Sequence, residues 1–165
     1  VKPVPAAKDG SVVKLDQFVV ARWNDVAHLR RKVDQYRGQI AAIVFEPVLC
    51  NTCVIEPAPG LMATIRELCD RDGMLMISDE TITGFRFGGS CAQGYYGYKP
   101  DLTILGKAVG GGTPFAALAG TKAAMAKITT SIAVPGVKPR LRICPSRTTL
   151  SPIWCRKPLA RPASS

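Results

Sequence analysis

The stretch Met74-Leu75-Met76-Ile77-Ser78-Asp79-Glu80 decides the fold of this chain. Its short apolar run follows Gly73 and stops at the acidic pair Asp79-Glu80. A run bounded by a glycine and by charge is typical of a strand buried on both faces of a parallel sheet. Ligands bind at the carboxyl ends of such strands, so we expect Asp79 to face a ligand crevice.

A second apolar run, Leu102-Thr103-Ile104-Leu105, ends in the same way and is followed by Gly106-Lys107. Lys107 lies 107 − 79 = 28 positions after Asp79, which is enough for a loop and one more strand. A lysine amine beside a partly desolvated carboxylate forms a Schiff base with an aldehyde cofactor. The carboxylate then keeps the cofactor's pyridine nitrogen protonated, which makes the ring an electron sink. The pair therefore predicts pyridoxal phosphate chemistry.

Three motifs carry a family resemblance. They are Glu46-Pro47-Val48, then Asp79-Glu80-Thr81-Ile82-Thr83-Gly84-Phe85-Arg86, then Leu105-Gly106-Lys107 with Gly110-Gly111-Gly112-Thr113-Pro114. In order and spacing they resemble class III pyridoxal-phosphate-dependent aminotransferases. Within that family they are most similar to the members related to glutamate-1-semialdehyde 2,1-aminomutase. The resemblance extends over residues 23–125.

The resemblance implies an α/β fold, namely the central part of the large domain of fold type I pyridoxal-phosphate-dependent transferases. Residues 1–128 would form part of this domain, with a mostly parallel sheet and flanking helices. The apolar runs predict strands near residues 40–45, 74–78, 101–105 and 115–119.

Two helices are predicted, one before the strand at residues 40–45 and one after it. Asn24 is expected to cap a helix from Asp25 to about Arg37, because Val26, Leu29, Val33 and Tyr36 form one apolar stripe. A second helix is expected to begin after Gly60 and to end at Gly73. Together these elements give strand, helix, strand in turn, the unit of a parallel sheet.

The resemblance also assigns roles to single residues. Lys107 would hold the cofactor and later move protons on the substrate carbon, and Asp79 would pair with the pyridine nitrogen. Glu46 would lie near the cofactor and support its hydrogen-bond network. Thr81 stands where relatives usually have an apolar residue that packs on the ring face, so its hydroxyl is a departure. Asn51 completes the expected cofactor-binding set.

The same residues bear on the reaction. Relatives of the ornithine type have glutamine at the position of Ile82 and glutamate at that of Asn51, so both residues favour the aminomutase-like branch. That reaction converts glutamate 1-semialdehyde to 5-aminolevulinate. An omega-amino-acid or oxo-acid aminotransferase of the same class and a catalytically inactive truncated remnant remain as alternatives. The implied partners are a small amino acid or amino-aldehyde substrate and, as is usual in the family, a second copy of the chain in a homodimer.

The length indicates a fragment. The chain has 165 residues, whereas class III enzymes are more than twice as long. The phosphate-binding helix terminus, the aromatic residue that stacks on the ring and the substrate-binding arginines lie upstream in relatives, and a threonine that reaches the neighbouring subunit lies downstream. We therefore expect the isolated chain to bind pyridoxal phosphate weakly or not at all.

Composition excludes several other classes. The apolar content of 47% is typical of a globular protein, and no apolar run approaches the ~20 residues of a membrane helix. The N-terminus lacks a signal-peptide pattern, which predicts a cytoplasmic protein without a membrane partner. From Thr129 onward there are seven positive residues, six prolines and no acids, which predicts a disordered tail over residues 129–165 or one outside the family's reading frame. Only Trp154 could stack on bases there, so we expect no nucleic-acid partner.

The spacing of the cysteines bears on metal binding and on redox chemistry. The pair Cys50-x-x-Cys53 would need a second pair of ligands to bind zinc, and the only histidine, His28, lies in a predicted helix. A redox motif would need to open a helix after a strand. We therefore expect reduced thiols and no metal.

Overall fold

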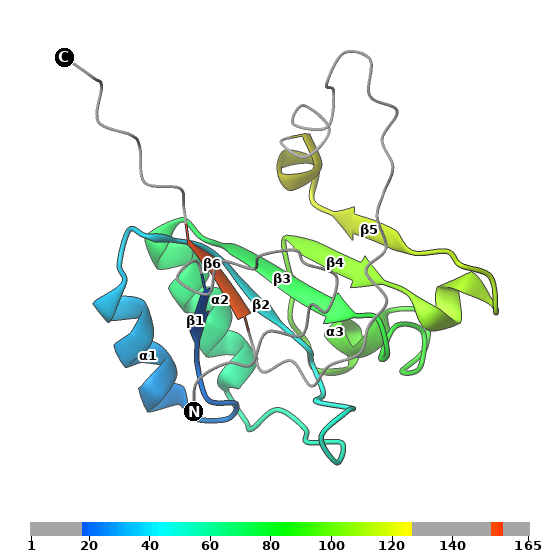
Figure 1. Ribbon diagram of the computed structural model, residues 1–165, viewed down its shortest axis with the longest axis horizontal. Helices are drawn as coiled ribbons and strands as arrows, with labels where there is room; N and C mark the ends of the chain where they lie inside the picture. Colours follow the sequence, from blue (N-terminus) through cyan, green and yellow to red (C-terminus); the bar gives the residue numbers. More distant parts are fainter. Residues whose placement is uncertain (1–17, 127–152, 157–165) are drawn as a thin grey trace, which may run out of the picture.

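The computed structural model describes residues 18–126 and the backbone of one further strand, 153–156. They form a six-stranded sheet in the order β1-β6-β2-β3-β4-β5 (Figure 1). The strands are β1 (Phe18–Val20), β2 (Ile40–Phe45), β3 (Leu75–Glu80), β4 (Leu102–Leu105), β5 (Ala117–Gly120) and β6 (Ile153–Arg156). Strands β2, β3 and β4 are parallel, whereas β5 and β6 run antiparallel to their neighbours. This arrangement confirms the expected α/β fold.

The strand positions agree with the sequence prediction to within two residues. Strand β2 has the predicted bounds, and β5 begins two residues later than predicted. Strand β3 extends to Glu80, beyond the predicted end at residue 78, because Asp79 pairs with Ile104 and Glu80 with Leu105 of β4. Both acidic residues thus lie inside the strand rather than after it.

Helix α1 (Val26–Gln35) begins differently from the prediction. Its N-cap is Asp25, whose carboxylate accepts a hydrogen bond of 2.8 Å from the His28 amide. The predicted cap, Asn24, has a left-handed backbone with φ +61°. Its side chain instead donates to the carbonyl of Glu56 and accepts from the amide of Ala58, at 2.9 and 2.7 Å. Asn24 therefore ties the start of α1 to the loop before the next helix, a contact that local sequence does not reveal.

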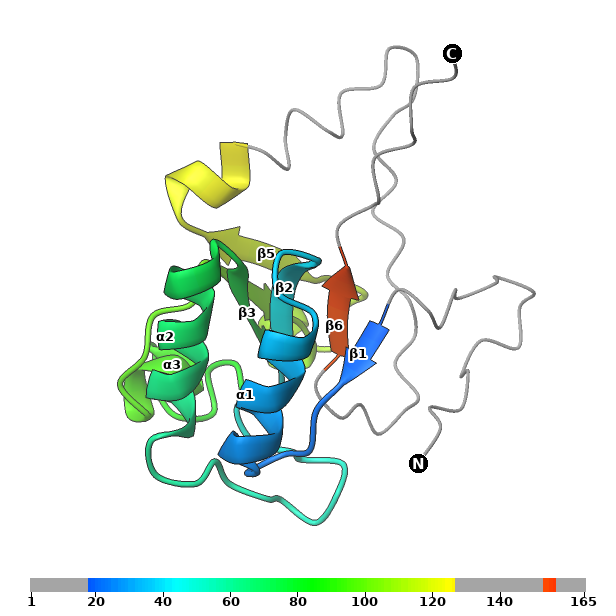
Figure 2. The same cartoon turned by 90° about the vertical axis from the view of Figure 1, so that its left-hand side faces the viewer.

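Helix α2 (Leu61–Asp72) ends at Gly73, as the sequence predicts. Gly73 is left-handed, and its amide bonds to the Cys69 carbonyl. Helices α1 and α2 lie side by side against one face of the sheet (Figure 2). Two ion pairs join them across the surface, Arg30 with Glu67 and Arg71 with Asp34.

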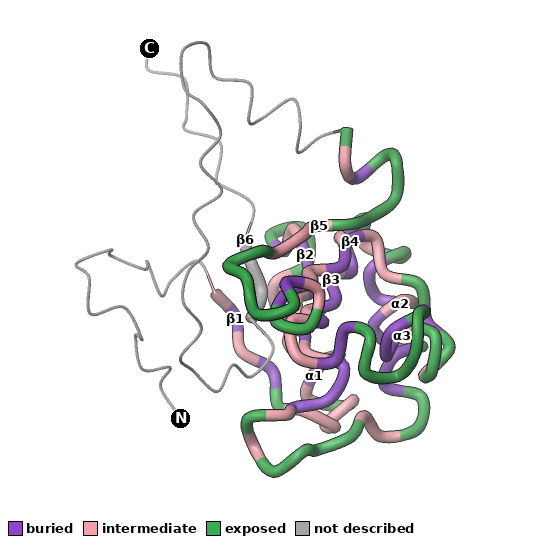
Figure 3. The backbone as a smooth tube through the Cα atoms, turned by 90° about the vertical axis from the view of Figure 1, so that its right-hand side faces the viewer, coloured by how far each residue is buried: buried purple, intermediate pink, exposed green. Residues whose placement is uncertain are grey.

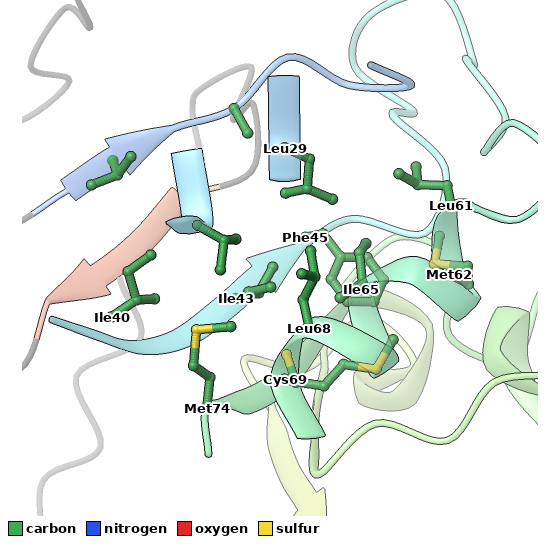
Figure 4. Packing of buried hydrophobic residues seen from close by; sticks show 14 of the residues in the cluster. Leu29, Ile40, Ile43, Phe45, Leu61, Met62, Ile65, Leu68, Cys69 and Met74 are labelled. Atoms are coloured by element: carbon green, nitrogen blue, oxygen red, sulfur yellow. The ribbon is translucent and has the colours of Figure 1, made fainter. Parts of the chain in front are cut away.

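The hydrophobic core fills the space between these helices and the sheet (Figure 4). Leu68 and Cys69 of α2 are fully buried against Ile43 and Phe45 of β2. Burial of this apolar surface is the main stabilising term of such a layer. The core thus fixes β2 and β3 beneath α2 and holds their carboxyl ends in one plane.

The opposite face of the sheet is only half covered by the described residues. In β3, Met76, Ser78 and Glu80 are buried, whereas Leu75, Ile77 and Asp79 are half-exposed. The expectation that β3 is buried on both faces is therefore wrong for the described residues, because α1 and α2 cover one face alone. Figure 3 shows the resulting pattern, with buried backbone in the strands and helices and exposed backbone mainly in their connections.

Strand β6 corrects part of the tail prediction. Residues 129–165 were expected to lack packed structure, yet β6 lies between β1 and β2, with Trp154 opposite Val19 on one side and Ile43 on the other. Each of those strands offers an edge of unpaired backbone groups, and the proline-free segment between Pro152 and Pro158 can pair with both. Residues 127–152 and 157–165 lie outside the described part of the chain, and so does the predicted boundary at residue 128.

Two short helices complete the fold. Helix α3 (Cys91–Tyr95) follows the connection after β3 and was not predicted. A helical segment over residues 122–126 follows β5. None of the helices in the described ranges has the length and hydropathy of a membrane span.

Candidate active site

The carboxyl ends of β2, β3 and β4 meet at one edge of the sheet (Figure 1). Parallel pairing sets Phe45 opposite Ser78 and Asp79 opposite Ile104. Glu46 follows β2 directly, Asp79 is the next-to-last residue of β3, and Lys107 lies two residues beyond β4. Three of the residues selected from the sequence are thereby brought to the same edge.

The charges of Asp79 and Lys107 both act on Glu46. Burial raises the pKa of the Glu46 carboxyl above its usual value, and the charge of Asp79 raises it further. The amide of Cys50, which donates to this carboxyl, and the charge of Lys107 both oppose the shift. Glu46 therefore holds its proton more tightly than an exposed glutamate does, and it does so within the field of both other groups.

The carboxylate of Asp79 is held from one side. Its Oδ1 accepts hydrogen bonds from the backbone amide of Thr81 at 3.0 Å and from the Thr81 hydroxyl at 2.5 Å. Its Oδ2 has no hydrogen-bond partner among the residues that the structure describes. Asp79 is half-buried. It thus presents one free acceptor atom from a fixed position.

Lys107 has an unusual backbone. It opens a 3-10 helix, η2 (Lys107–Gly110), with φ +48°, a left-handed conformation that a side chain with a Cβ adopts at a cost. The residue before it, Gly106, comes so close to Thr81 that a Cβ at position 106 would lie 3.1 Å from the Thr81 methyl. The Lys107 side chain is exposed and forms no hydrogen bond or ion pair with residues 18–126.

The glycines that follow η2 shape the next turn. Gly111 and Gly112 both have positive φ, at +54° and +94°. The segment thus follows a strand as a 3-10 turn and does not lead into a long helix, as a nucleotide-phosphate loop would.

Asn51 and the two nearby cysteines lie on a tight loop after Glu46. The backbones of Leu49 and Ile55 pair across its base, and Asn51 is exposed at its tip. Burial raises the pKa of the Cys50 thiol, as does the charge of Glu46, whereas Lys107 opposes the shift. The four described cysteines are free thiols, as expected: Cys50, Cys53, Cys69 and Cys91. Within the described residues no group of three or more possible ligands could hold a metal ion.

Glu80 is a site residue that sequence reasoning missed. Its side chain is fully buried, and its carboxylate accepts three hydrogen bonds: from the Thr83 hydroxyl at 2.9 Å, the Ala92 amide at 2.8 Å and the Gln93 amide at 2.9 Å. It thereby fixes the start of α3 to the end of β3. The donors at positions 92 and 93 follow twelve and thirteen residues later, so no local pattern indicates the contact.

The connection between β3 and α3 carries a further cation to this edge. Arg86 is exposed, and its Nε donates to the Ile82 carbonyl at 3.2 Å. Its charge opposes the raised pKa of the Cys50 thiol, which indicates that the guanidinium lies near the same loop. Gly84 allows this turn, because a Cβ there would lie 2.7 Å from the Glu80 carbonyl oxygen.

The arrangement of an acid at the end of one parallel strand and a lysine after the next agrees with the sequence comparisons. The profile of the family described as Aminotransferase class-III matches residues 4–134. The chain belongs to this family. The match covers the motifs around Glu46, Asp79 and Lys107, so the family and the site rest on the same residues.

Individual relatives within the class III aminotransferases extend this finding. The chain is 48% identical over 121 residues to the glutamate-1-semialdehyde 2,1-aminomutase of Nitrosospira multiformis. This alignment covers 73% of the present chain and 28% of that protein. The chain thus spans about a quarter of the length of the curated relative it matches.

Solved structures of the family resemble the fold. An omega-transaminase from Sphaerobacter thermophilus matches with a TM-score of 0.63 and 31% identity, over 73% of this chain and 26% of that one. A glutamate-1-semialdehyde-aminomutase from Pseudomonas aeruginosa matches with a TM-score of 0.59 and 32% identity, over 74% and 26%. A variant of a glutamate-1-semialdehyde-aminomutase from the same organism was solved in complex with PMP. It matches with a TM-score of 0.59 and 31% identity, over 74% of this chain and 26% of that one.

Proposed function

We propose that this chain carries the lysine and carboxylate portion of a pyridoxal phosphate site, with Lys107 as the catalytic residue. One observation carries the proposal: Asp79 and Lys107 lie at the same carboxyl edge of the sheet, and within residues 18–126 neither Oδ2 of Asp79 nor Nζ of Lys107 has a partner. The residues fit this cofactor, because an acceptor for a ring N–H and an amine for an aldehyde are the two groups that its reactive portion needs. The glycine at position 106 lets the backbone before Lys107 come close to Thr81, and such a site uses a close approach of the backbone.

Pyridoxal phosphate, when bound, supplies an aldehyde that captures amines and a pyridine ring that accepts electrons. The protein groups divide the remaining work. Asp79 Oδ2 accepts the ring N–H and keeps the positive charge on the ring. Lys107 Nζ holds the cofactor and then takes up and returns the proton at the amino-bearing carbon of the substrate. Glu46, whose carboxyl has a pKa raised by burial and by the charge of Asp79, would lie near the cofactor and support its hydrogen-bond network.

Thr81 and Asn51 are proposed as the remaining contacts of the cofactor. Thr81 lies between Asp79 and Gly106, with its methyl group against the backbone that leads to Lys107. Asn51 is exposed on the loop whose first residues carry Cys50 and the amide that binds Glu46. Both residues therefore border the edge at which the ring would lie.

For the reaction, we propose an intramolecular transfer of an amino group from glutamate 1-semialdehyde to give 5-aminolevulinate. The identity of 48% with an aminomutase supports it. The second candidate is an omega-amino-acid or oxo-acid aminotransferase, which the TM-score of 0.63 to the omega-transaminase from Sphaerobacter thermophilus supports.

The proposed partners follow from the same family. The substrate is a small amino acid or amino-aldehyde, and the working form is a homodimer located in the cytoplasm. A size measurement on the purified chain tests the dimer directly. A monomer at all concentrations would contradict this part of the proposal for the 165-residue chain.

Borohydride trapping tests the role of Lys107. The chain is titrated with pyridoxal phosphate, reduced with borohydride and mapped by peptide mass spectrometry, beside a Lys107→Ala variant. We expect weak binding, with a Kd on the order of 1 mM, because phosphate-binding groups supply much of the affinity for this cofactor. The trapped label should nevertheless fall on Lys107, and Lys107→Ala should lose it. Equal labelling of many lysines would remove Lys107 from the mechanism.

A further inference from the structure

Thr81 lies between the two groups to which we assign the chemistry. Its backbone amide and its hydroxyl both donate to Oδ1 of Asp79, at 3.0 and 2.5 Å. On its other side, a Cβ at Gly106 would lie 3.1 Å from its methyl carbon. The side chain is half-buried, so these contacts are partly shielded from water. One residue thus contacts both the acid and the backbone that precedes Lys107.

The two donors affect the two oxygens of Asp79 differently. Oδ1 is occupied by Thr81, whereas Oδ2 has no partner within the described part of the chain. The amide and the hydroxyl of Thr81 together hold the carboxylate of Asp79 in one orientation. The hydroxyl also takes up part of the negative charge of the carboxylate, which leaves Oδ2 a weaker acceptor for a further donor.

We propose that Thr81 is a positioning residue. Its hydroxyl fixes Asp79 with Oδ2 toward the cofactor, and it makes this acid hold the proton on the ring nitrogen less tightly. The inference rests on the proposed function, since it concerns the same site. It assigns the hydroxyl a chemical effect on Asp79, whereas the resemblance assigns this position only packing on the ring. An apolar residue at position 81 would leave Asp79 a stronger acceptor.

Other charged groups at this edge of the sheet must stay constant in a test. Glu46 interacts with Asp79 and with Lys107. Cys50 interacts with Glu46, Lys107 and Arg86. Substitutions at position 81 leave all of these residues unchanged. A difference between variants at this position therefore reports on Thr81 itself.

Three substitutions separate the hydroxyl from the methyl group. Thr81→Val keeps the shape and the methyl contact with Gly106 but removes the hydroxyl donor. Thr81→Ser keeps the donor and removes the methyl. Thr81→Ala removes both and provides a second chain without the hydroxyl. Backbone amide spectra of each chain, compared with the wild type, show that the fold is kept.

The measurement uses a cofactor labelled with ¹⁵N at the ring nitrogen. The chain is incubated with excess pyridoxal phosphate, so that Lys107 Nζ and the aldehyde form a C=N bond with loss of water. Borohydride then delivers hydride to the carbon, and a proton from water completes a stable secondary amine. Peptide mapping confirms that the label is on Lys107. The pH midpoint at which the ring nitrogen loses its proton is read from the ¹⁵N shift, independently of any activity.

We expect Thr81→Val and Thr81→Ala to raise this midpoint by roughly 0.5 to 1 pH unit and Thr81→Ser to leave it near the wild-type value. Asp79→Asn should lower it below all of them. A midpoint in Thr81→Val at or below that of the wild type, with the label on Lys107, would overturn the inference alone. A label distributed over other lysines would instead overturn the proposed function, and the inference with it.

Discussion

At the scale of single residues, the candidate site depends on how each charged group is surrounded. Glu46 is desolvated and faces Asp79, so the pKa of its carboxyl lies above the usual value. Asp79 accepts two hydrogen bonds at one oxygen, and its other oxygen has no partner among the residues for which the structure gives side chains. Lys107 is exposed on a left-handed backbone. Strain of this kind is found where function requires a fixed direction of a side chain, which agrees with the proposed role of this lysine.

Glu46 gives the stability of the chain a predictable dependence on pH. Because its pKa is higher in the folded chain than the ordinary 4.5, the folded state binds more protons in this window. Stability must therefore fall as the pH rises from 4.5 through the raised value. Glu46→Gln should remove this contribution, because an amide does not titrate and its oxygen can still accept from the Cys50 amide.

Urea unfolding of both chains between pH 4 and 8 tests this dependence. The variant should gain stability relative to the wild type as the pH rises, and the gain should level off above the raised pKa. A gain that grows toward acid pH would contradict the assignment of Glu46 as a desolvated carboxyl.

At the scale of elements, Glu80 joins the end of β3 to the first turn of α3. It is the last residue of β3, and its carboxylate holds the first turn of α3 together with Thr83. The segment between them contains Gly84 and Arg86, which border the site. The position of this connection therefore depends on one buried carboxylate.

Glu80→Gln should be strongly destabilising. The carboxylate oxygen that accepts hydrogen bonds would be replaced by an NH₂ group, which cannot accept from the donors around it. A buried donor would therefore lose its partner. We expect a loss of about 2–4 kcal/mol in the free energy of unfolding. The matched control is Glu67→Gln, which makes the same substitution in an exposed ion pair with Arg30 and should cost far less. Equal losses in the two variants would show that the three contacts of Glu80 contribute little.

At the scale of the whole molecule, the sheet is completed by a segment distant in sequence. Strands β1 and β2 belong to one strand–helix–strand unit, yet β6 lies between them. Because β6 has a neighbour on each side, each of its backbone amides points toward one of the two strands. The described sheet thus depends on a strand from the basic, proline-rich part of the chain.

Trp154→Pro tests this placement through the backbone alone. Proline removes one amide donor from the centre of β6, so β1 and the facing residues of β2 should lose protection. In hydrogen exchange we expect the amides of Phe18–Val20 to exchange about tenfold faster or more. Leu159→Pro, which lies three residues beyond the strand, serves as the control. Unchanged exchange in Trp154→Pro would show that β6 does not pair with these strands.

The sequence by itself determined the family, the parallel centre of the sheet and the order of Glu46, Asp79 and Lys107. It could do so because each residue lies at or just beyond the end of a short apolar run, and because parallel strands bring such ends to one edge. Gly73 likewise marked the end of α2, since a left-handed residue there is local chemistry.

Only the tertiary structure decided the rest. The partners of Glu80, the link from Asn24 to the loop before α2 and the pairing of β6 join residues between 12 and more than 100 positions apart. The hydrogen bond from Thr81 to Asp79 is local, but Thr81 comes close to Gly106 only when β4 pairs with β3. Such contacts depend on which backbone and side-chain groups remain unpaired once the sheet has formed, and no local pattern of residues records that.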